Sequence, residues 1–240
     1  ADGIEPAIKP GAALIFACGL SVGSGLVQPR ADLDVILASP KGIGPRIRDL
    51  YEEGQGVFCL FGVHQDASGK AHALGLSYTA ALGCGRKGIL ETTFAAECES
   101  DLFGEQVVLC GGVKDLVDGA FTKLVEAGYP PEVAWFECFY ELKLVTDLMF
   151  EKGIAGAFGR ISNTAEYGAY LTGPRVLGEA SKAAMDEVLA EVLPADKAQA
   201  VRDLQGEVWA PRSHARSHPA ARRVPRNVCR PTRLCMLTQA

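Results

Sequence analysis

Four short apolar runs, separated by glycines, prolines and charged residues, constrain the fold of this 240-residue chain most strongly. Runs of about four to eight apolar residues are typical of strands buried on both faces. Residues 69–83 have the pattern of a crossover helix. The first part of the chain is therefore predicted to be a parallel, helix-covered sheet, with strands at residues 13–18, 34–38, 56–63 and 88–92.

From about residue 100 the pattern changes to long helical segments. Gly128 and Pro130, and later Gly173 and Pro174, have the positions of helix stops and starts. We therefore place a boundary near residue 94, between an α/β domain (1–93) and an all-α domain (94–205). The helices are predicted at residues 101–111, 114–127, 131–151, 164–171 and 175–193.

The last 35 residues differ in composition from the rest. Residues 206–240 hold seven of the 24 basic residues and one of the 29 acidic residues, so they carry +6 and the rest of the chain −11. We expect a disordered basic tail here. Nucleic-acid binding is the alternative, and the lack of interleaved aromatic residues makes it the weaker one.

The eight cysteines form no CxxC pair and most lie in apolar runs. They are expected to be reduced, buried thiols of a cytoplasmic protein. The run that ends at Cys18 is also similar to a short signal peptide, but the regular α/β pattern around it favours a strand. No apolar run is long enough to cross a membrane.

The helix predicted over 130–153 is apolar on nearly all sides, which indicates a buried position. Its exceptions include Glu137 and Glu141, which are four residues apart and so share one face. Ala134, Leu144 and Leu148 continue that face. A solvated pair would have polar neighbours and a basic partner four residues on, and neither is present.

Asp101 and Glu105 have the same spacing, after Ser100 as a candidate N-cap. The helix dipole alone explains acids in a first turn, and this reading stays open for the pair. Two repulsive carboxylate pairs are explained together if a cation binds between the helices. Oxygen ligands without histidine favour Mg²⁺ or Mn²⁺.

Several long motifs in this sequence resemble ketol-acid reductoisomerase (acetohydroxy-acid isomeroreductase) of the short, bacterial type. The resemblance runs from about residue 11 to residue 193. It is carried by ASPKGIGP, VHQDASGKA, DLFGEQVVLCGG, WFECFYELKLVTDLMFEKGIAG and ISNTAEYGAYLTGPRV.

The resemblance implies a Rossmann-type parallel sheet followed by an all-α knotted helical domain, and a role for each matching residue. Glu97 matches a glutamate that supports metal and substrate, Ser162 a serine that binds the substrate carboxylate, and Lys41 a lysine that organises the active site. Gly44 matches a glycine whose backbone approaches NADPH. Without the family, Ser162 is equally well a residue beside the capping box of Asn163 and Glu166. The ligands of two Mg²⁺ ions match Asp101, Glu105, Glu137 and Glu141.

The implied reaction is alkyl migration in an acetohydroxy acid such as 2-acetolactate or 2-aceto-2-hydroxybutyrate, followed by reduction with NADPH to a 2,3-dihydroxy acid. It belongs to valine, isoleucine and leucine biosynthesis. One ion stabilises the alkoxide that drives migration, and both polarise the accepting carbonyl. The resemblance also implies a homodimer or higher homo-oligomer in which the partner subunit supplies the second glutamate pair and the serine.

Two departures from the family pattern concern the active site. The chain starts after the family's Gly-rich pyrophosphate loop, and Gly42 and Gly44 with Ile47 make no dinucleotide fingerprint, so we expect NADPH binding to be weakened. Cys18 stands where the family has an active-site histidine, and a thiol is a poor replacement for a general acid. The alternative is thus a truncated, non-reducing relative: a pseudo-enzyme or metal-binding dimerisation module.

Overall fold

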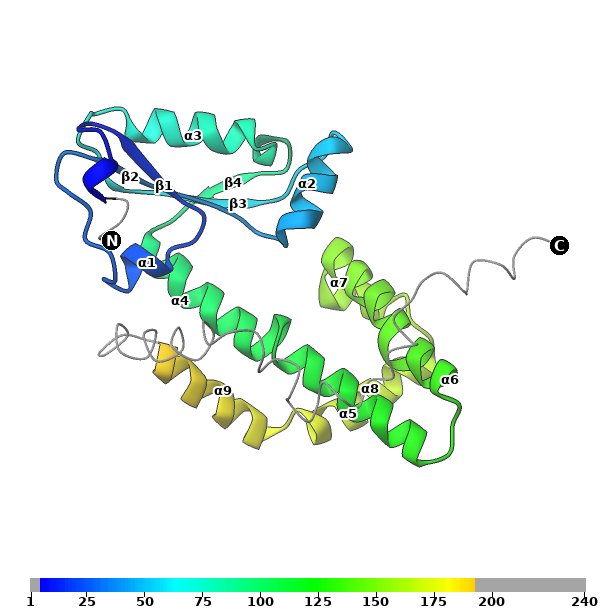
Figure 1. The fold of residues 1–240 in the computed structure, drawn as a ribbon. Helices are drawn as coiled ribbons and strands as arrows, with labels where there is room; N and C mark the ends of the chain where they lie inside the picture. The colour runs from blue at the N-terminus through cyan, green and yellow to red at the C-terminus, as the bar shows by residue number, and fades with distance from the viewer. Residues whose placement is uncertain (1–4, 193–240) are drawn as a thin grey trace. The chain divides into compact units, whose positions relative to one another are not determined.

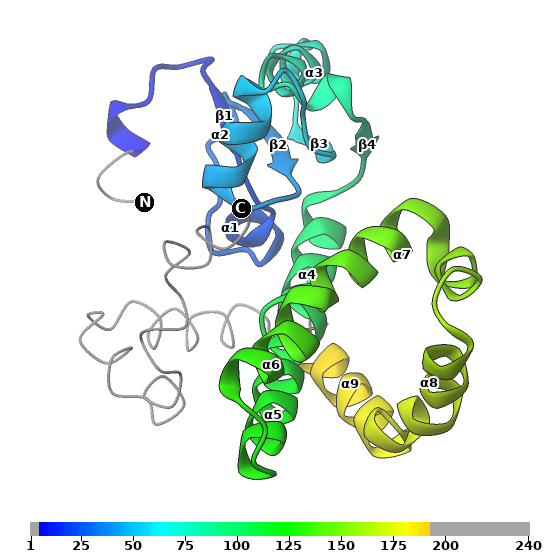
Figure 2. The same cartoon turned by 90° about the vertical axis from the view of Figure 1, so that its right-hand side faces the viewer.

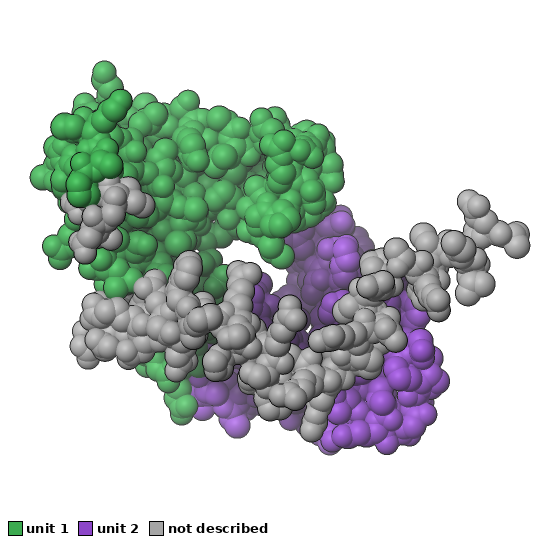
Figure 3. All heavy atoms as spheres, in the orientation of Figure 1, with its two compact units in different colours: residues 1–106, 187–201 green, residues 107–186, 202–240 purple. Residues whose placement is uncertain are grey.

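A computed structural model of the chain describes residues 5–192 (Figure 1). The described residues divide into two compact units, residues 5–106 with 187–192 and residues 107–186 (Figure 3). The predicted tail at 206–240, with Cys229 and Cys235, lies outside the described residues. None of the described helices is both long and apolar enough to cross a membrane.

The sheet of the first unit has the strand order β1-β2-β3-β4. Pairs β1–β2 and β3–β4 are parallel, which confirms the predicted parallel character, whereas β2–β3 is antiparallel. Helix α2, which joins β2 to β3, buries none of its side chains and so does not cover a sheet face as the crossover helix of a parallel pair does. The strands are β1 (Ala13–Phe16), β2 (Asp34–Pro40), β3 (Cys59–Gln65) and β4 (Ile89–Glu91), and α2 is Gly44–Glu52.

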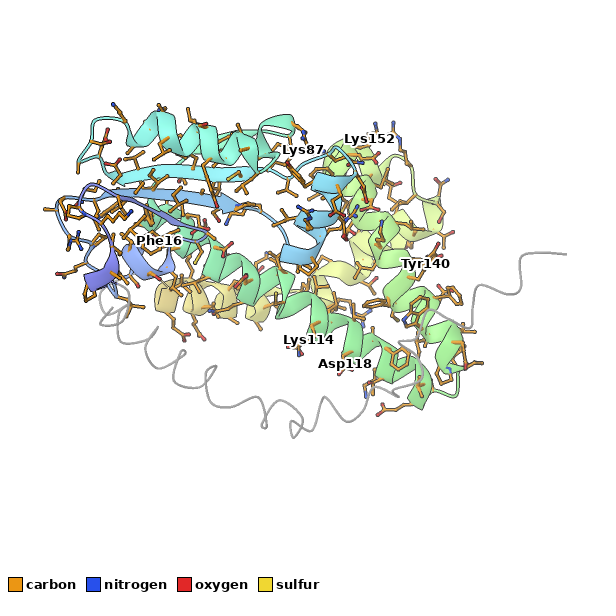
Figure 4. The ribbon with its side chains drawn as sticks, turned by 45° about the horizontal axis from the view of Figure 1, so that its top comes forward. Phe16, Lys87, Lys114, Asp118, Tyr140 and Lys152 are labelled. Carbon is orange, nitrogen blue, oxygen red and sulfur yellow. The ribbon has the colours of Figure 1, made fainter. Side chains whose placement is uncertain are left out.

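Helices cover both faces of this sheet, with α3 on one side and α1 and the start of α4 on the other (Figure 1). Alternate residues of β2 serve the two cores. Val35 and Leu37 pack with Phe94 and Phe16 beside α4, while Ile36 packs with Phe61 beside α3. Phe16, labelled in Figure 4, meets the Phe94 ring edge-on at 5.9 Å between centroids. The helical elements are η1 (Glu5–Ala7), α1 (Leu20–Gly23), α3 (Ala71–Ala81), η2 (Cys84–Arg86) and α4 (Phe94–Gly104).

Helix α4 begins seven residues earlier than the sequence pattern indicated. Its N-cap is Thr93, whose hydroxyl accepts a hydrogen bond from Ala96 N at 3.1 Å. The prediction of Ser100 as the cap is wrong: its hydroxyl donates to the Ala96 carbonyl inside the helix, at 2.8 Å. Asp101 therefore lies well past the first turn, and the helix dipole does not explain its position.

The remaining elements are helical, as predicted, but the predicted stop and start at Gly173 and Pro174 is wrong, because one helix continues from Asn163 to Val176 with Pro174 inside it. Gly153 has a left-handed backbone (φ 69°) that interrupts α7, close to where the predicted helix 131–151 ends, and the change of direction is visible in Figure 2. The α-helices are α5 (Gly112–Glu126), α6 (Pro131–Trp135), α7 (Glu141–Phe158), α8 (Asn163–Val176) and α9 (Glu179–Val192), and two π-helical segments are η3 (Glu105–Leu109) and η4 (Phe136–Tyr140).

The six described cysteines are free thiols. Cys59, Cys84 and Cys98 are buried, as predicted, and burial raises the pKa of Cys59 to about 12. Cys18 and Cys110 are exposed, so the prediction of burial is wrong for these two. Cys18 follows the end of β1, where the chain leaves the sheet, and Cys110 lies in the turn after η3.

A stripe of small residues brings α3 close to the sheet. A Cβ atom on Gly75 would lie 2.4 Å from the Phe61 ring and 2.7 Å from Ile36. We expect Gly75→Ala to lower the free energy of unfolding by about 1–2 kcal/mol, because overpacking outweighs the gain in helix propensity. Urea unfolding measures the change.

Gly104→Ala is the matched control, because nothing lies within 4 Å of a Cβ atom built there. This variant should be unchanged or up to about 1 kcal/mol more stable. Equal stabilities for the two variants would contradict the close packing of α3.

Candidate active site

The candidate site forms where β1 and β2 end. Because these strands are parallel, their carboxyl ends meet at one edge of the sheet, the usual place for ligands in α/β folds. Cys18 and Gly19 follow β1, and Ser39 lies near the end of β2, just before Lys41. Helix α4 brings its first acidic side chain, Glu97, to the same edge.

The Glu97 carboxylate is the buried centre of this site, with 1% of the residue exposed. It accepts three hydrogen bonds within the first unit. Ser39 Oγ and Lys41 Nζ each donate to Oε1 at 2.6 Å, and the Gly19 backbone N–H donates to Oε2. These three donors hold the orientation of the buried carboxylate.

Lys41 links Glu97 to the predicted metal ligand Asp101. Its ammonium group lies 2.9 Å from Asp101 Oδ1, and the Lys41 side chain is about one-third exposed. Burial by itself would lower the pKa of Lys41, but the hydrogen bonds to the two carboxylates outweigh burial and raise it. The lysine is therefore a fixed positive charge at this edge.

Glu105 follows Asp101 on the same helical face. Burial, and then repulsion by Asp101, raise the pKa of Glu105. The two carboxylates thus offer hard oxygen ligands and a surplus of negative charge that a divalent cation would relieve. The donor set fits Mg²⁺, although no group of three or more His, Cys, Asp or Glu side chains suited to a metal is present among residues 5–192.

Glu137 and Glu141 belong to the second unit. Both are exposed, and neither forms an ion pair with a described residue. Their helix was predicted to be buried, yet Phe139 and Leu144 are 55% and 51% exposed. The prediction of burial is therefore wrong for this helix among the described residues.

Three further residues of interest lie at loop–helix junctions. Ser162 is the N-cap of α8, and its Oγ accepts a hydrogen bond from Ala165 N at 3.2 Å. Gly44 is the first residue of α2, and a Cβ atom there would meet nothing within 4 Å. Cys18 presents an exposed thiol. Of the predicted site residues, the first unit brings together Lys41, Glu97, Asp101 and Glu105.

Ser39 and the Gly19 amide are site groups that the sequence pattern did not reveal. A Cβ atom on Gly19 would lie 2.3 Å from the Phe94 carbonyl oxygen and 2.7 Å from Glu97 Oε2, so only glycine fits there. The sequence did offer one sign of a role for Ser39, because its hydroxyl lies at the end of a mainly apolar strand, where it needs a hydrogen-bond partner. Both residues are far from Glu97 in sequence, which hides the contact.

Replacing Lys41 by methionine tests the electrostatic role of the lysine. Glu97 would stay buried without its counter-charge, so Lys41→Met is expected to lower the free energy of unfolding by about 3 kcal/mol. The control Arg48→Met breaks an exposed ion pair with Glu52 and should cost at most about 1 kcal/mol. Urea unfolding at neutral pH compares them, and similar losses would contradict this account.

Replacing Glu105 by glutamine should stabilise the metal-free protein at neutral pH. A raised pKa means that the ionised carboxylate is disfavoured in the folded state, so the penalty is present above the folded pKa and absent well below the ordinary value of 4.5. Removing one charge of an i,i+4 pair is worth about 0.2–0.5 kcal/mol. Glu105→Gln should melt higher than the wild type at pH 7 and equally near pH 3, and a lower Tm at pH 7 would contradict the prediction.

Comparison with known proteins places the chain in a family. Residues 1–88 match the acetohydroxy acid isomeroreductase NADPH-binding domain, and residues 94–220 match the ketol-acid reductoisomerase C-terminal domain. The second match extends into the segment predicted to be a tail.

Solved structures agree with these matches. An NADH-preferring ketol-acid reductoisomerase from an uncultured archaeon is 39% identical, with a TM-score of 0.82 over 91% of this chain and 67% of that one. A semialdehyde dehydrogenase NAD-binding protein from Cupriavidus necator, 16% identical over 85% of this chain and 72% of that one, has a TM-score of 0.60 and shares only the fold. This chain therefore belongs to the ketol-acid reductoisomerase family.

Proposed function

We propose that this chain catalyses Mg²⁺-dependent alkyl migration in 2-acetolactate or 2-aceto-2-hydroxybutyrate, followed by NADPH reduction to a 2,3-dihydroxy acid. The reaction is a step in valine, isoleucine and leucine biosynthesis. The observation that carries the proposal is the Lys41–Glu97–Asp101 cluster, which lies at the ligand-binding edge of the sheet in a chain of this family. Six free cysteines support a reducing, cytoplasmic compartment.

The proposed metal site uses both carboxylate pairs. Asp101 and Glu105 would hold one side of it, and Glu137 and Glu141 from a partner subunit the other. Two bound Mg²⁺ ions would stabilise an alkoxide and polarise a carbonyl, and the nicotinamide would supply a hydride. The open space beside the Gly44 backbone supports an approach of the cofactor there.

Lys41 and Glu97 have distinct proposed roles. Lys41 holds Asp101 in place through the 2.9 Å contact and provides positive charge next to the substrate carboxylate. Glu97 holds Lys41, and its own orientation is set by Ser39 and the Gly19 amide. A carboxylate with this many donors is a rigid support for the groups around it.

Ser162 is proposed to bind the substrate carboxylate. As the N-cap of α8 its oxygen accepts the Ala165 N–H, which leaves the hydroxyl hydrogen available to donate. The start of a helix also favours a negatively charged ligand. These two features support a carboxylate as the bound group.

A homodimer or higher homo-oligomer is proposed as the active form, with a knotted path of the helices as part of it. Between residues 107 and 186 only Ala134 and Ala157 are buried. Large apolar side chains in that range, such as Phe139 (55% exposed) and Ile154 (69% exposed), face solvent. Large exposed apolar surfaces mark interaction sites, which supports burial against a second copy.

The second candidate is a non-reducing relative that binds metal and dimerises, as a pseudo-enzyme. It is favoured by Cys18, an exposed thiol where the resemblance expects a histidine. A thiol does not provide a proton near neutral pH as an imidazole does. In this second candidate, the carboxylate cluster serves metal binding and dimerisation and takes no part in a reduction.

Oxidation of NADPH or NADH with 2-acetolactate, with and without Mg²⁺, separates the two candidates. Turnover by the wild-type chain would contradict the second candidate, and Mg²⁺-dependent stabilisation without turnover would contradict the first. Cys18→His is the informative variant, because an imidazole restores the titrating group at this place. A rise in kcat in this variant would support the reductoisomerase reaction.

The metal assignment has its own test in thermal unfolding. Mg²⁺ should raise the Tm of the wild type through binding to the folded state, and Glu137→Gln should abolish this shift. Glu132→Gln, in the first turn of α6, is the matched control and should keep it. An unchanged shift in Glu137→Gln would count against this residue as a ligand.

A further inference from the structure

Both carboxylate pairs adjoin π-helical turns. Among residues 5–192 the backbone adopts π winding only in η3 and η4. Glu105 is the first residue of η3; Glu137 lies inside η4, and Glu141 directly follows it. Well under 1% of residues in globular proteins are in π-helices, and these turns occur mainly at functional sites. Two such turns, each at a carboxylate pair, call for a physical reason.

The η4 turn lies between the members of its pair. The Glu141 N–H bonds to the Phe136 carbonyl, five residues back, instead of to the carbonyl of Glu137. The wider turn changes the rotation between Glu137 and Glu141 from that of an α-helix, so the angle between their side chains depends on the π winding.

Aromatic stacking marks the same turn. Trp135 stacks on Tyr140, which is labelled in Figure 4, with ring centroids 6.0 Å apart and an interplanar angle of 29°. In an α-helix side chains five positions apart point about 140° away from each other and do not stack. The contact is therefore possible because of the π turn, and the stack stabilises that turn in return. Phe136 adds an edge contact to Tyr140 at 5.7 Å.

A glycine accompanies the π turn that begins at Glu105. A Cβ atom on Gly112 would lie 2.0 Å from the Val107 carbonyl oxygen, which is five residues earlier. This is a backbone atom that no side-chain rotation can move, so the chain after η3 accepts only glycine here. Gly119 lies about two turns further along α5, and a Cβ atom there would meet nothing within 4 Å.

We propose that the two π turns are positioning devices of the metal site, with Gly112 permitting the turn at η3 and the Trp135–Tyr140 stack holding the turn at η4. The inference rests on the proposed Mg²⁺ site and adds residues that hold its ligands without binding the metal. Tyr140, Trp135 and Gly112 are accordingly positioning residues.

Isothermal titration with Mg²⁺ tests the proposal on the full chain. Tyr140→Ala removes the stack and is expected to weaken Mg²⁺ binding by about 10–100-fold, as is usual when groups that orient metal ligands are lost. Tyr140→Phe keeps the ring and should restore binding to within about twofold of the wild type. Gly112→Ala should weaken binding to a similar extent, and its control Gly119→Ala should not.

The outcomes separate this inference from the function on which it rests. A wild-type chain that binds no Mg²⁺ would overturn the proposed metal site, and the inference with it. If the wild type binds, Tyr140→Ala or Gly112→Ala with unchanged affinity and unchanged helix content would overturn the role of its segment alone. Where Tyr140→Ala loses helix content, Tyr140→Leu replaces it, because leucine keeps apolar bulk without a ring.

Discussion

The buried Glu97 carboxylate is the interaction on which the described site depends. An ionised carboxylate away from water is stable only when donors surround it, and here they come from three separate places: the loop after β1, the end of β2 and the lysine beyond it. Because these groups converge on one side chain of α4, they fix that helix against the sheet. The position of Asp101, one turn further along, follows from this anchor.

The second unit has a different physical character. Its helices are rich in large apolar side chains, yet almost none of them is buried among the described residues of the chain. In the proposed homo-oligomer, a second copy of the chain would cover these side chains with an apolar surface of matching kind. The same partner would bring Glu137 and Glu141 to the carboxylates of the first unit. In this proposal, dimerisation therefore both covers the apolar helices and completes the metal site.

The sequence predicted the elements better than their junctions. The four strands were found because apolar runs of their length have no other simple interpretation, and Gly153 ended a helix where the pattern ended. The start of α4 was missed because Ser100 is a good cap by type, whereas Thr93 is the residue at which the chain leaves β4. The π turns were not predicted either, since the carboxylate spacing of four fits an α-helix as well.

The sequence by itself determined the family, the α/β-then-α organisation, and the carboxylates and lysine that carry the proposed chemistry, because long motifs and apolar periodicity are local properties of the chain. The tertiary structure decided what is non-local. It showed that Ser39 and the Gly19 amide hold Glu97, that β2 and β3 run antiparallel, and that Gly112 and the Trp135–Tyr140 pair accompany π turns. Each of these depends on atoms brought together by folding, and spacing along the chain does not record such distances.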